Sequence, residues 1–372
     1  PARRAMAKKA PPPPLGPLSA PAADETHVVV RKVVVIYNPK AGKGKAKHVL
    51  ERVVLPALQA AAVGAVVVQT ARQAHTVELA RTVDLGGVDA LCAIGGDGTI
   101  SELVTGFLQR PDAEQAAVGL GFIPAGTGNA LMREWAATRP PKHLPAAADA
   151  KKIVDAIISG RCRQMDVVRG ECQAADGSPF TRMSVNAIHW GLGTDANVQA
   201  EKLRMLGPIR YDLGILYELM KMRKRPCTIT AKGAVNKTPD VSGDGVTVDP
   251  DGTISFSYNG VLVSAMNSKY TGDGLRLAPF AQLDDGKMDL IFSSRRLCRS
   301  NAIKVFQGVK NGGTHVHNPD VAYYQADSLT LEAPKPMLLN FDGENVGYTP
   351  LRATLMPKAV RVFVPDQMAK PI

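Results

Sequence analysis

Asp97 is the one carboxylate in a turn that otherwise consists of small residues, Gly95-Gly96-Asp97-Gly98-Thr99. The glycines allow a phosphate chain to approach the backbone closely, and Thr99 offers a hydroxyl hydrogen bond. An acid among phosphates is repelled unless it holds Mg²⁺ or accepts a proton from an attacking hydroxyl. The competing interpretation is a helix N-cap, for which Asp is well suited. The turn alone does not decide between the two.

Two further glycine turns follow apolar segments of the same kind. Residues 38–46 read NPKAGKGKA, and their backbone N–H groups and the next helix N-terminus favour an anion. This turn lacks the GxxxxGK[ST] order of a Walker A loop. Residues 123–131 read IPAGTGNAL and repeat the scheme of strand, glycine turn and helix. The pattern suits phosphate binding at these turns, and an ordinary chain turn is the alternative for NPKAGKGKA.

The segments around these turns alternate between strand-like and helix-like patterns. Such an alternation predicts an α/β fold with a doubly wound parallel sheet. Because the carboxyl ends of parallel strands meet at one edge, we expect Asn38, Asp97 and Gly126 to lie together there. The strand-like runs stand at the start of 31–46, at 65–70 and at the start of 89–99, and helix-like segments stand at 48–62, at 75–85 and from Ser101 to Val104. Residues 119–135 contain a fourth strand, a glycine turn and a helix.

After about residue 160 the alternation stops, and short strand-like runs separated by turn signals predict antiparallel β structure. Helical segments interrupt it at 200–225 and 300–312. We predict a disordered Pro/Ala-rich tail at 1–27, an α/β nucleotide-binding domain at 28–160 and a β-rich domain at 161–372. The boundary is left open between 150 and 165, because the second domain can share strands with the first.

Composition limits the classes of partner. Lys and Arg outnumber Asp and Glu by 45 to 34, a net charge of +11, which suits nucleotide phosphates, acidic lipids or nucleic acid. No RNP, KH or zinc pattern is present, so nucleic-acid binding is not predicted. The five cysteines are scattered without a CxxC pair, which favours a reduced compartment over a disulfide framework or a metal cluster. No apolar run reaches transmembrane length.

The order NPKAGKG, GGDGT and IPAGTGNAL, completed by Asp342-Gly343-Glu344, resembles the catalytic region of the diacylglycerol kinase and sphingosine kinase superfamily of lipid kinases. Residues 70–99 and 190–214 look most like sphingosine, or long-chain base, kinases. The resemblance implies a doubly wound nucleotide-binding domain, and a C-terminal antiparallel β-sandwich-like domain with helices over a lipid pocket. It also implies ATP and Mg²⁺ as cofactors, without a metal site built by the protein alone.

The same resemblance assigns roles to residues. Asp97 would be the base that activates the lipid hydroxyl, and Asp195 and Asn197 would meet the lipid head. Arginine suits phosphate because its planar fork binds two oxygens, although a solvated helix face is the alternative for each Arg. The implied nucleotide contacts are Asn38, Pro39, Lys40, Thr70, Ala71, Arg72, Gln73, Ala74, Gly95, Gly96, Gly126, Thr127, Gly128, Arg204, Arg210, Asp342, Gly343 and Glu344.

The sequence departs from the sphingosine kinase pattern at the lipid head. Asp195 matches the first acid of the pattern, but Asn197 stands at the second. An amide can hydrogen-bond a hydroxyl, yet it carries no charge for a protonated amine. Ala200 replaces the Ser of the pattern, and RYDLG at 210–214 looks more like ceramide kinases, whose substrate has a neutral amide.

Apolar residues at helical spacing within 203–222 predict a helix pair over an acyl-chain pocket, with ordinary core packing as the alternative. The basic run KMRKR at 221–225 can meet acidic headgroups or simply complement a helix end. We therefore expect a cytoplasmic protein with peripheral contact to acidic membranes. The sequence carries no signal for an oligomeric state.

We predict an ATP-dependent kinase that phosphorylates the primary hydroxyl of a sphingoid base. Ceramide kinase or diacylglycerol kinase is the alternative. An NAD kinase also carries GGDGT on a related fold, but it needs no acyl pocket, and the segment at 190–212 argues against it. A non-catalytic lipid-binding module is disfavoured because Asp97 and the Asp342-Gly343-Glu344 turn are intact.

Overall fold

The computed structural model describes residues 26–365 except 73, 112–117, 127–128, 135–145, 207–208, 239–245 and 273. Most of the predicted tail at 1–27 lies outside the described residues. Its last two residues form strand β1 (Thr26–His27), which pairs antiparallel with Cys162 and Arg161.

The first part of the chain is a parallel sheet with helices on both faces. Its strands are β2 (Lys32–Tyr37), β3 (Gly64–Gln69), β4 (Ala90–Gly95) and β5 (Gly119–Pro124). Its helical segments are η1 (Ala41–Gly44), α1 (Lys45–Val49), the π-helical η2 (Leu50–Val54), α2 (Leu55–Ala60), α3 (His75–Thr82), α4 (Asp97–Leu108), α5 (Ala130–Glu134) and α6 (Ala146–Ser159).

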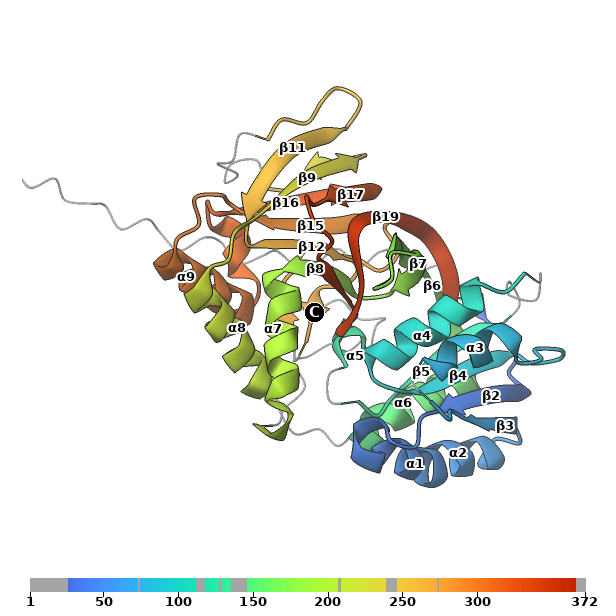
Figure 1. Ribbon diagram of the computed structural model, residues 1–372. Helices are drawn as coiled ribbons and strands as arrows, with labels where there is room; N and C mark the ends of the chain where they lie inside the picture. The colour runs from blue at the N-terminus through green and yellow to red at the C-terminus, as the bar shows by residue number, and fades with distance from the viewer. Residues whose placement is uncertain are drawn as a thin grey trace, which may run out of the picture.

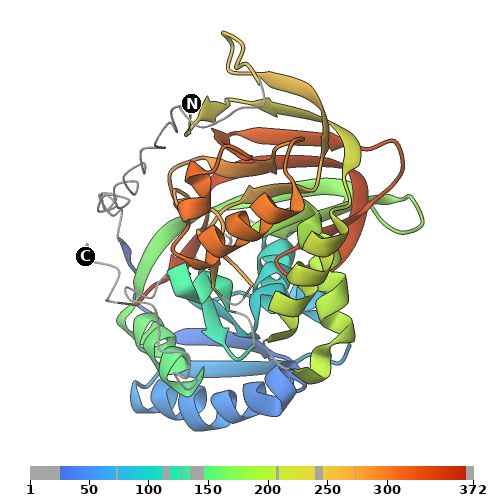
Figure 2. The ribbon, with the colours of Figure 1, turned by 90° about the vertical axis from the view of Figure 1, so that its left-hand side faces the viewer.

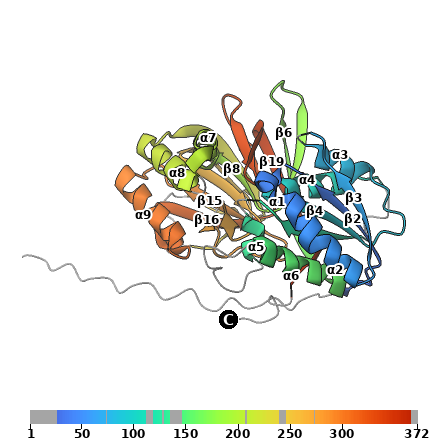
Figure 3. The ribbon, with the colours of Figure 1, turned by 90° about the horizontal axis from the view of Figure 1, so that it is seen from below.

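These strands are parallel in the order β3, β2, β4, β5, which confirms the doubly wound sheet. Helices α1, α2 and α6 cover one face, and α3 and α4 cover the other (Figure 1, Figure 3). Every residue of β4 and β5 is buried, as expected for parallel strands between two helical layers. Because α4 begins two residues after β4 ends, Asp97 lies at the carboxyl edge of the sheet.

The second part of the chain is antiparallel and carries its helices on one side (Figure 1, Figure 2). Its strands are β6 (Arg161–Gln173), β7 (Pro179–Ser184), β8 (Ala187–Gly191), β9 (Arg225–Lys232), β10 (Val235–Asn236), β11 (Ile254–Gly260), β12 (Leu262–Met266), β13 (Tyr270–Thr271), β14 (Leu275–Arg276), β15 (Met288–Ser293), β16 (Val321–Ala326), β17 (Ser328–Glu332), β18 (Leu338–Phe341) and β19 (Glu344–Phe363). Its helical segments are α7 (Leu192–Lys202), η4 (Arg204–Leu206), α8 (Ile209–Lys221), α9 (Arg299–Lys310) and η5 (Thr314–His317).

The long strands β6 and β19 pair antiparallel and run through both parts. Strand β6 contributes Met165 to the core under the parallel sheet and Cys172 to the second core. Strand β19 likewise contributes Val362 to the first core and Leu351 to the second. Strands are thus shared, and the division into 28–160 and 161–372 stays a prediction.

The second core is rich in aromatic side chains, among them Trp190, Tyr258, Phe292 and Phe341. The rings of Tyr258 and Phe292 have centroids 6.4 Å apart and are tilted by 54°. Such tilted contacts are a favoured arrangement of aromatic pairs. In the part of the chain that the structure describes, no helix is long and apolar enough to span a membrane.

Helices α3 and α4 cross closely at Gly106. A Cβ atom on Gly106 would lie 2.2 Å from the backbone oxygen of Val77 and 2.7 Å from Cβ of Ala80. Gly106→Ala therefore overpacks this contact, and we expect a net loss of about 1–2 kcal/mol after the gain in helix propensity is counted. The urea midpoint of the purified protein measures it.

Gly64→Ala is the matched control, because its new Cβ would meet only the Arg31 oxygen at 3.5 Å. Equal midpoints for Gly106→Ala and Gly64→Ala would contradict the close packing of α3 and α4.

Candidate active site

The Asp97 carboxylate is buried at the start of α4, with 9% of the residue exposed. It accepts hydrogen bonds from the backbone N–H of Ala130 at 2.9 Å and of Leu131 at 3.4 Å. These are the first two residues of α5. The N-cap residue of α4 is Gly96, so Asp97 does not cap its own helix. Instead, a helix that follows the next strand orients the carboxylate.

The pKa of Asp97 is raised to about 7, mainly by burial and to a smaller extent by the negative charge of Asp342. The N–H groups of Ala130 and Leu131 and the charge of Arg133 act in the opposite direction. A carboxylate that gains and loses its proton near neutral pH suits general-base chemistry.

The Asp342 carboxylate binds four donors inside the protein. It accepts hydrogen bonds from the Ser184 hydroxyl at 2.7 Å and from the N–H groups of Val185, Asn186 and Ala187 at 3.0, 2.9 and 2.8 Å. Three of these bonds end on Oδ1, and only the Val185 bond ends on Oδ2. Burial raises the pKa of Asp342. Asp342 therefore fixes the corner between β7 and β8, and its contact with nucleotide stays a prediction.

Glu344 lies against the turn at residues 95–99, although it comes from near the other end of the chain. This turn carries Asp97, the proposed base, and is called the catalytic turn below. A Cβ atom on Gly98 would be 2.4 Å from Glu344 Oε1, so a side chain at this position would force the Glu344 carboxylate to move. Arg182 donates to Glu344 Oε2 at 2.9 Å. The structure thus brings the predicted residues Asp97 and Glu344 together, and it adds Arg182, which the sequence motifs did not single out.

The three glycine turns interlock at the carboxyl edge of the sheet. The N–H groups of Ala125 and Gly126 donate to the Gly95 oxygen at 2.8 and 3.2 Å. A Cβ atom on Gly126 would lie 2.5 Å from Cα of Gly96, and one on Gly42 would lie 2.0 Å from the Ala125 oxygen. The turns predicted to meet at one edge do so.

The side chain of Asn38 closes the first glycine turn, at residues 38–46. Asn38 Oδ1 accepts a hydrogen bond from the Lys40 N–H at 2.9 Å, across Pro39. Three of the predicted nucleotide contacts, Gln73, Thr127 and Gly128, lie outside the described residues.

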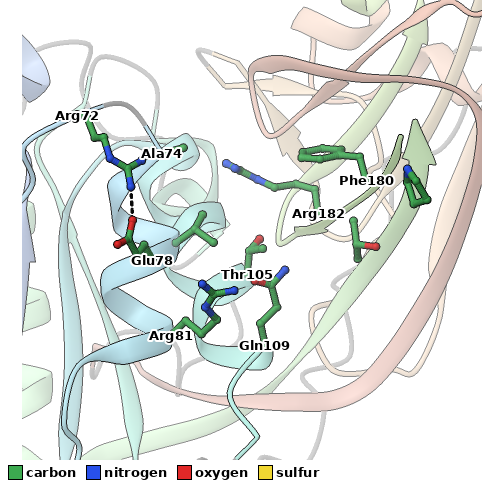
Figure 4. A pocket seen from close by; sticks show the side chains of 11 residues that line it. Arg72, Ala74, Glu78, Arg81, Thr105, Gln109, Phe180 and Arg182 are labelled. Atoms are coloured by element: carbon green, nitrogen blue, oxygen red, sulfur yellow. Dashed lines mark hydrogen bonds and ion pairs between the residues drawn. The ribbon is translucent and has the colours of Figure 1, made fainter. Parts of the chain in front are cut away.

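The segment from Thr70 to Ala74 leads into α3. Thr70 is buried and donates its N–H to the Tyr37 oxygen at 3.0 Å, and the Ala71 N–H donates to His75 Nδ1 at 2.9 Å. Beyond this segment opens a cavity of about 420 Å³ between α3, α4 and β7, lined by Arg72 and Ala74 among others. Arg72 pairs with Glu78 along its α3 wall (Figure 4).

The predicted phosphate ligands of the second part lie on η4 and α8. The Arg210 guanidinium donates to the Tyr211 hydroxyl at 2.8 Å and lies 3.6 Å from Glu201 Oε1. Arg204 belongs to η4. Contact of either residue with nucleotide remains a prediction.

Both predicted lipid-head residues have partners inside the protein. Asp195 forms an ion pair with Arg225. Asn197 Nδ2 donates to the Gly343 oxygen at 2.8 Å and to Asn345 Oδ1 at 3.2 Å. Asn197 therefore ties α7 to the Asp342-Gly343-Glu344 turn. The sequence analysis placed Arg225 only in the basic run at 221–225 and missed its pairing with Asp195, because the two residues are 30 positions apart.

Among the described residues, no group of three or more His, Cys, Asp or Glu side chains is arranged to hold a metal ion. Near the catalytic turn, the carboxylates of Asp97 and Glu344 are nevertheless oxygen donors of the kind that Mg²⁺ prefers.

The fold and site are those of a lipid kinase with a catalytic domain and a β-rich second domain. Residues 32–170 match the diacylglycerol kinase catalytic domain, and residues 186–364 match the YegS C-terminal NAD kinase beta sandwich-like domain. A putative diacylglycerol kinase from Bacillus anthracis str. Sterne has the same fold, with a TM-score of 0.65 at 22% identity over 91% of this chain and 99% of that one.

Curated relatives agree with the family. The chain is 28% identical to sphingosine kinase 1 of Arabidopsis thaliana over 84% of this chain and 68% of that protein. It is 26% identical to sphingoid long chain base kinase 4 of Schizosaccharomyces pombe over 88% of this chain and 74% of that protein. The chain belongs to the diacylglycerol kinase and sphingosine kinase superfamily and is an ATP-dependent lipid kinase.

The raised pKa of Asp97 generates a prediction about pH. Below about 7 the carboxyl is protonated and cannot accept the proton of a substrate hydroxyl, so kcat/KM should rise with pH through this region. We expect an inflection near neutral pH in a profile measured from about pH 5 to about pH 9 at saturating ATP.

Asp97→Asn keeps the size of the side chain and removes the base. It should lower turnover by about a hundredfold or more and abolish the inflection. Thermal unfolding of the same samples shows whether the variant is folded. Near-wild-type turnover in a folded Asp97→Asn protein would eliminate Asp97 as the base.

Proposed function

We propose that this kinase transfers the γ-phosphoryl group of ATP to the primary hydroxyl of a sphingoid base, with ceramide or diacylglycerol as the alternative acceptor. The observation that carries the proposal is the Asp97 carboxylate, held by two backbone N–H groups at the glycine turn with a pKa of about 7. The relatives named sphingosine kinase and sphingoid long chain base kinase favour the sphingoid acceptor.

In the proposed mechanism, Asp97 accepts the proton of the substrate hydroxyl as its oxygen forms a bond to the γ-phosphorus. The bond from the γ-phosphorus to the bridging oxygen breaks, and ADP leaves. Phosphoryl transfer needs mainly positioning and charge stabilisation, so a well-placed base among backbone N–H donors is sufficient protein chemistry. The amides of Ala130 and Leu131 keep the carboxylate oriented throughout.

Mg²⁺ would be held by the ATP phosphates together with Glu344, the carboxylate at the turn that is not assigned as the base. When bound, it would supply neutralisation of the phosphate charge.

The acceptor is tested with labelled ATP and mixed micelles that contain sphingosine, phytosphingosine, ceramide or diacylglycerol, with NAD in a parallel reaction. Phosphate on sphingosine or phytosphingosine would support the proposal. Phosphate on ceramide or diacylglycerol alone would move the protein to the alternative acceptor. Phosphate on NAD, or on none of these, would overturn a lipid acceptor.

Asn197 generates a prediction about the lipid head. Because Arg225 already balances Asp195, no unpaired carboxylate at these two positions faces an incoming ammonium group. Asn197→Asp adds one, so it should raise kcat/KM for sphingosine relative to that for ceramide by about tenfold.

Asn197→Ala is the matched control. Both substitutions remove the hydrogen bond from Asn197 to the Gly343 oxygen, but only the aspartate adds charge. The same ratio in both variants would show that charge at this position does not select the substrate.

We also propose that the η4–α8 face binds the surface of an acidic membrane. Its apolar side chains are not core residues: Met205 is 98% exposed, Ile209 57% and Met220 60%. The face continues with Leu206, Leu213, Leu216 and Tyr217, which are also exposed. Exposed apolar side chains gathered on one helix mark an interaction site, and the exposed Lys221 and Lys224 match anionic headgroups. The two arginines of the basic run pair with Glu218 and Asp195 instead. Figure 2 shows α7, α8 and α9 side by side on this flank.

Co-sedimentation with vesicles of phosphatidylcholine and phosphatidylserine tests this face. Ile209→Asp should lower vesicle binding by about tenfold. It removes an aliphatic side chain that would be buried in the bilayer, and it adds a negative charge that the anionic headgroups repel. Val235→Asp is the control, since Val235 is a comparably exposed apolar residue (52%) on β10. Equal losses in the two variants would contradict a specific η4–α8 contact.

A further inference from the structure

Arg182 is a buried arginine whose polar contacts all lead to the catalytic turn. Its side chain is 5% exposed. Nε donates to the Ser101 hydroxyl at 3.1 Å, and one terminal nitrogen donates to the Gly98 oxygen at 3.4 Å and to Glu344 Oε2 at 2.9 Å. Ser101 and Gly98 both lie in the first turns of α4, which begins with Asp97. The guanidinium thus joins β7, α4 and the turn that ends at Glu344.

Arg182 supplies the cation that pairs with Glu344. The Arg182 side chain is 5% exposed and the Glu344 side chain 35%, and the paired nitrogen and oxygen lie 2.9 Å apart. The acids Glu102 and Asp342 are close enough for their charges to act on Glu344. Without Arg182, the Glu344 carboxylate would face these acids without its cation, and the repulsion would favour its movement away from the turn.

Arg182 also borders the cavity of about 420 Å³. It extends from β7 into this space toward the opposite wall, which is formed by α3 with Glu78 and by Ala74, the residue before α3 (Figure 4). The residues expected on the adenosine side, Arg72 and Ala74, belong to the same cavity. Arg182 therefore contacts Glu344 and also lines the cavity next to the position predicted for the nucleoside of ATP.

We infer that Arg182 is a positioning residue for ATP, acting by holding Glu344 against the Gly98 end of the catalytic turn. The inference rests on the proposed use of ATP at this site, and no lipid contact is required of Arg182. Loss of its charge should weaken ATP binding and leave the KM for the lipid unchanged. A merely structural bridge between β7 and α4 would instead lower stability without changing ATP affinity in the folded protein.

The experiment is isothermal titration of the full chain with MgATP in the absence of lipid, together with the KM values for ATP and for lipid. Arg182→Met keeps the length of the side chain and removes the charge. We expect its ATP Kd to rise by about tenfold to a hundredfold, the range expected for loss of one charge-assisted hydrogen bond. Arg182→Lys should recover part of the affinity, because it restores the charge without the planar fork.

A double-mutant cycle separates a route through Glu344 from a direct one. If Arg182 acts through Glu344, Arg182→Met and Glu344→Gln together should weaken ATP binding no more than the more severe single variant. Additive losses would overturn the route through Glu344. If Arg182→Met does not fold, Arg182→Lys combined with Glu344→Gln provides the same cycle.

Arg169→Met is the control, because Arg169 is a part-exposed arginine on the neighbouring strand β6 whose ion pair, at 3.5 Å, is with Glu171 and not with Glu344. It should bind ATP as the wild type does. An unchanged ATP Kd in folded Arg182→Met would overturn the inference while leaving lipid phosphorylation intact. Failure of the wild type to phosphorylate any lipid, with ATP affinity still dependent on Arg182, would instead reject the proposed function and keep the inference.

Discussion

The Asp342 carboxylate accepts four hydrogen bonds from residues 184–187, in the interior of the protein. A carboxylate is stable there only because donors surround it, so its position is tightly specified. Its backbone has a left-handed φ of 50°, which turns the chain toward Gly343 and Glu344. From this anchor, Glu344 reaches Arg182 and the Gly343 oxygen reaches Asn197. The positions of the catalytic turn and of α7 therefore both depend on the buried Asp342 carboxylate.

The charge of Asp342 also affects the pKa of Asp97, the proposed catalytic base. Asp97 is close enough to Asp342 for its pKa to be raised by it, in addition to the larger effect of burial. The N–H groups at the start of α5 offset part of this cost by stabilising the charged form. The two buried acids accept hydrogen bonds from different donors and therefore have different tasks. Asp342 organises the fold around the site, and Asp97 keeps a pKa of about 7.

At the two positions proposed for the lipid head, the protein satisfies its own polar groups. Asp195 is balanced by Arg225, and Asn197 is occupied by backbone and amide oxygens. Apolar side chains of η4 and of α8, which packs against α7, are by contrast left exposed. Internally paired polar groups and exposed apolar side chains fit the proposal of a substrate that arrives from a lipid phase.

Local sequence patterns were sufficient to predict the parallel sheet and the position of Asp97 at the end of one of its strands. This is because β-branched runs, glycine turns and helical spacing are properties of neighbouring residues. The meeting of the three turns also followed, since carboxyl ends of parallel strands share one edge. What only the tertiary structure decided are contacts between distant segments: α5 amides on Asp97, Arg182 on Glu344, Arg225 on Asp195, and strands β6 and β19 shared by both cores. Periodicity carries no information about these partners, because each depends on how separately formed elements pack against one another.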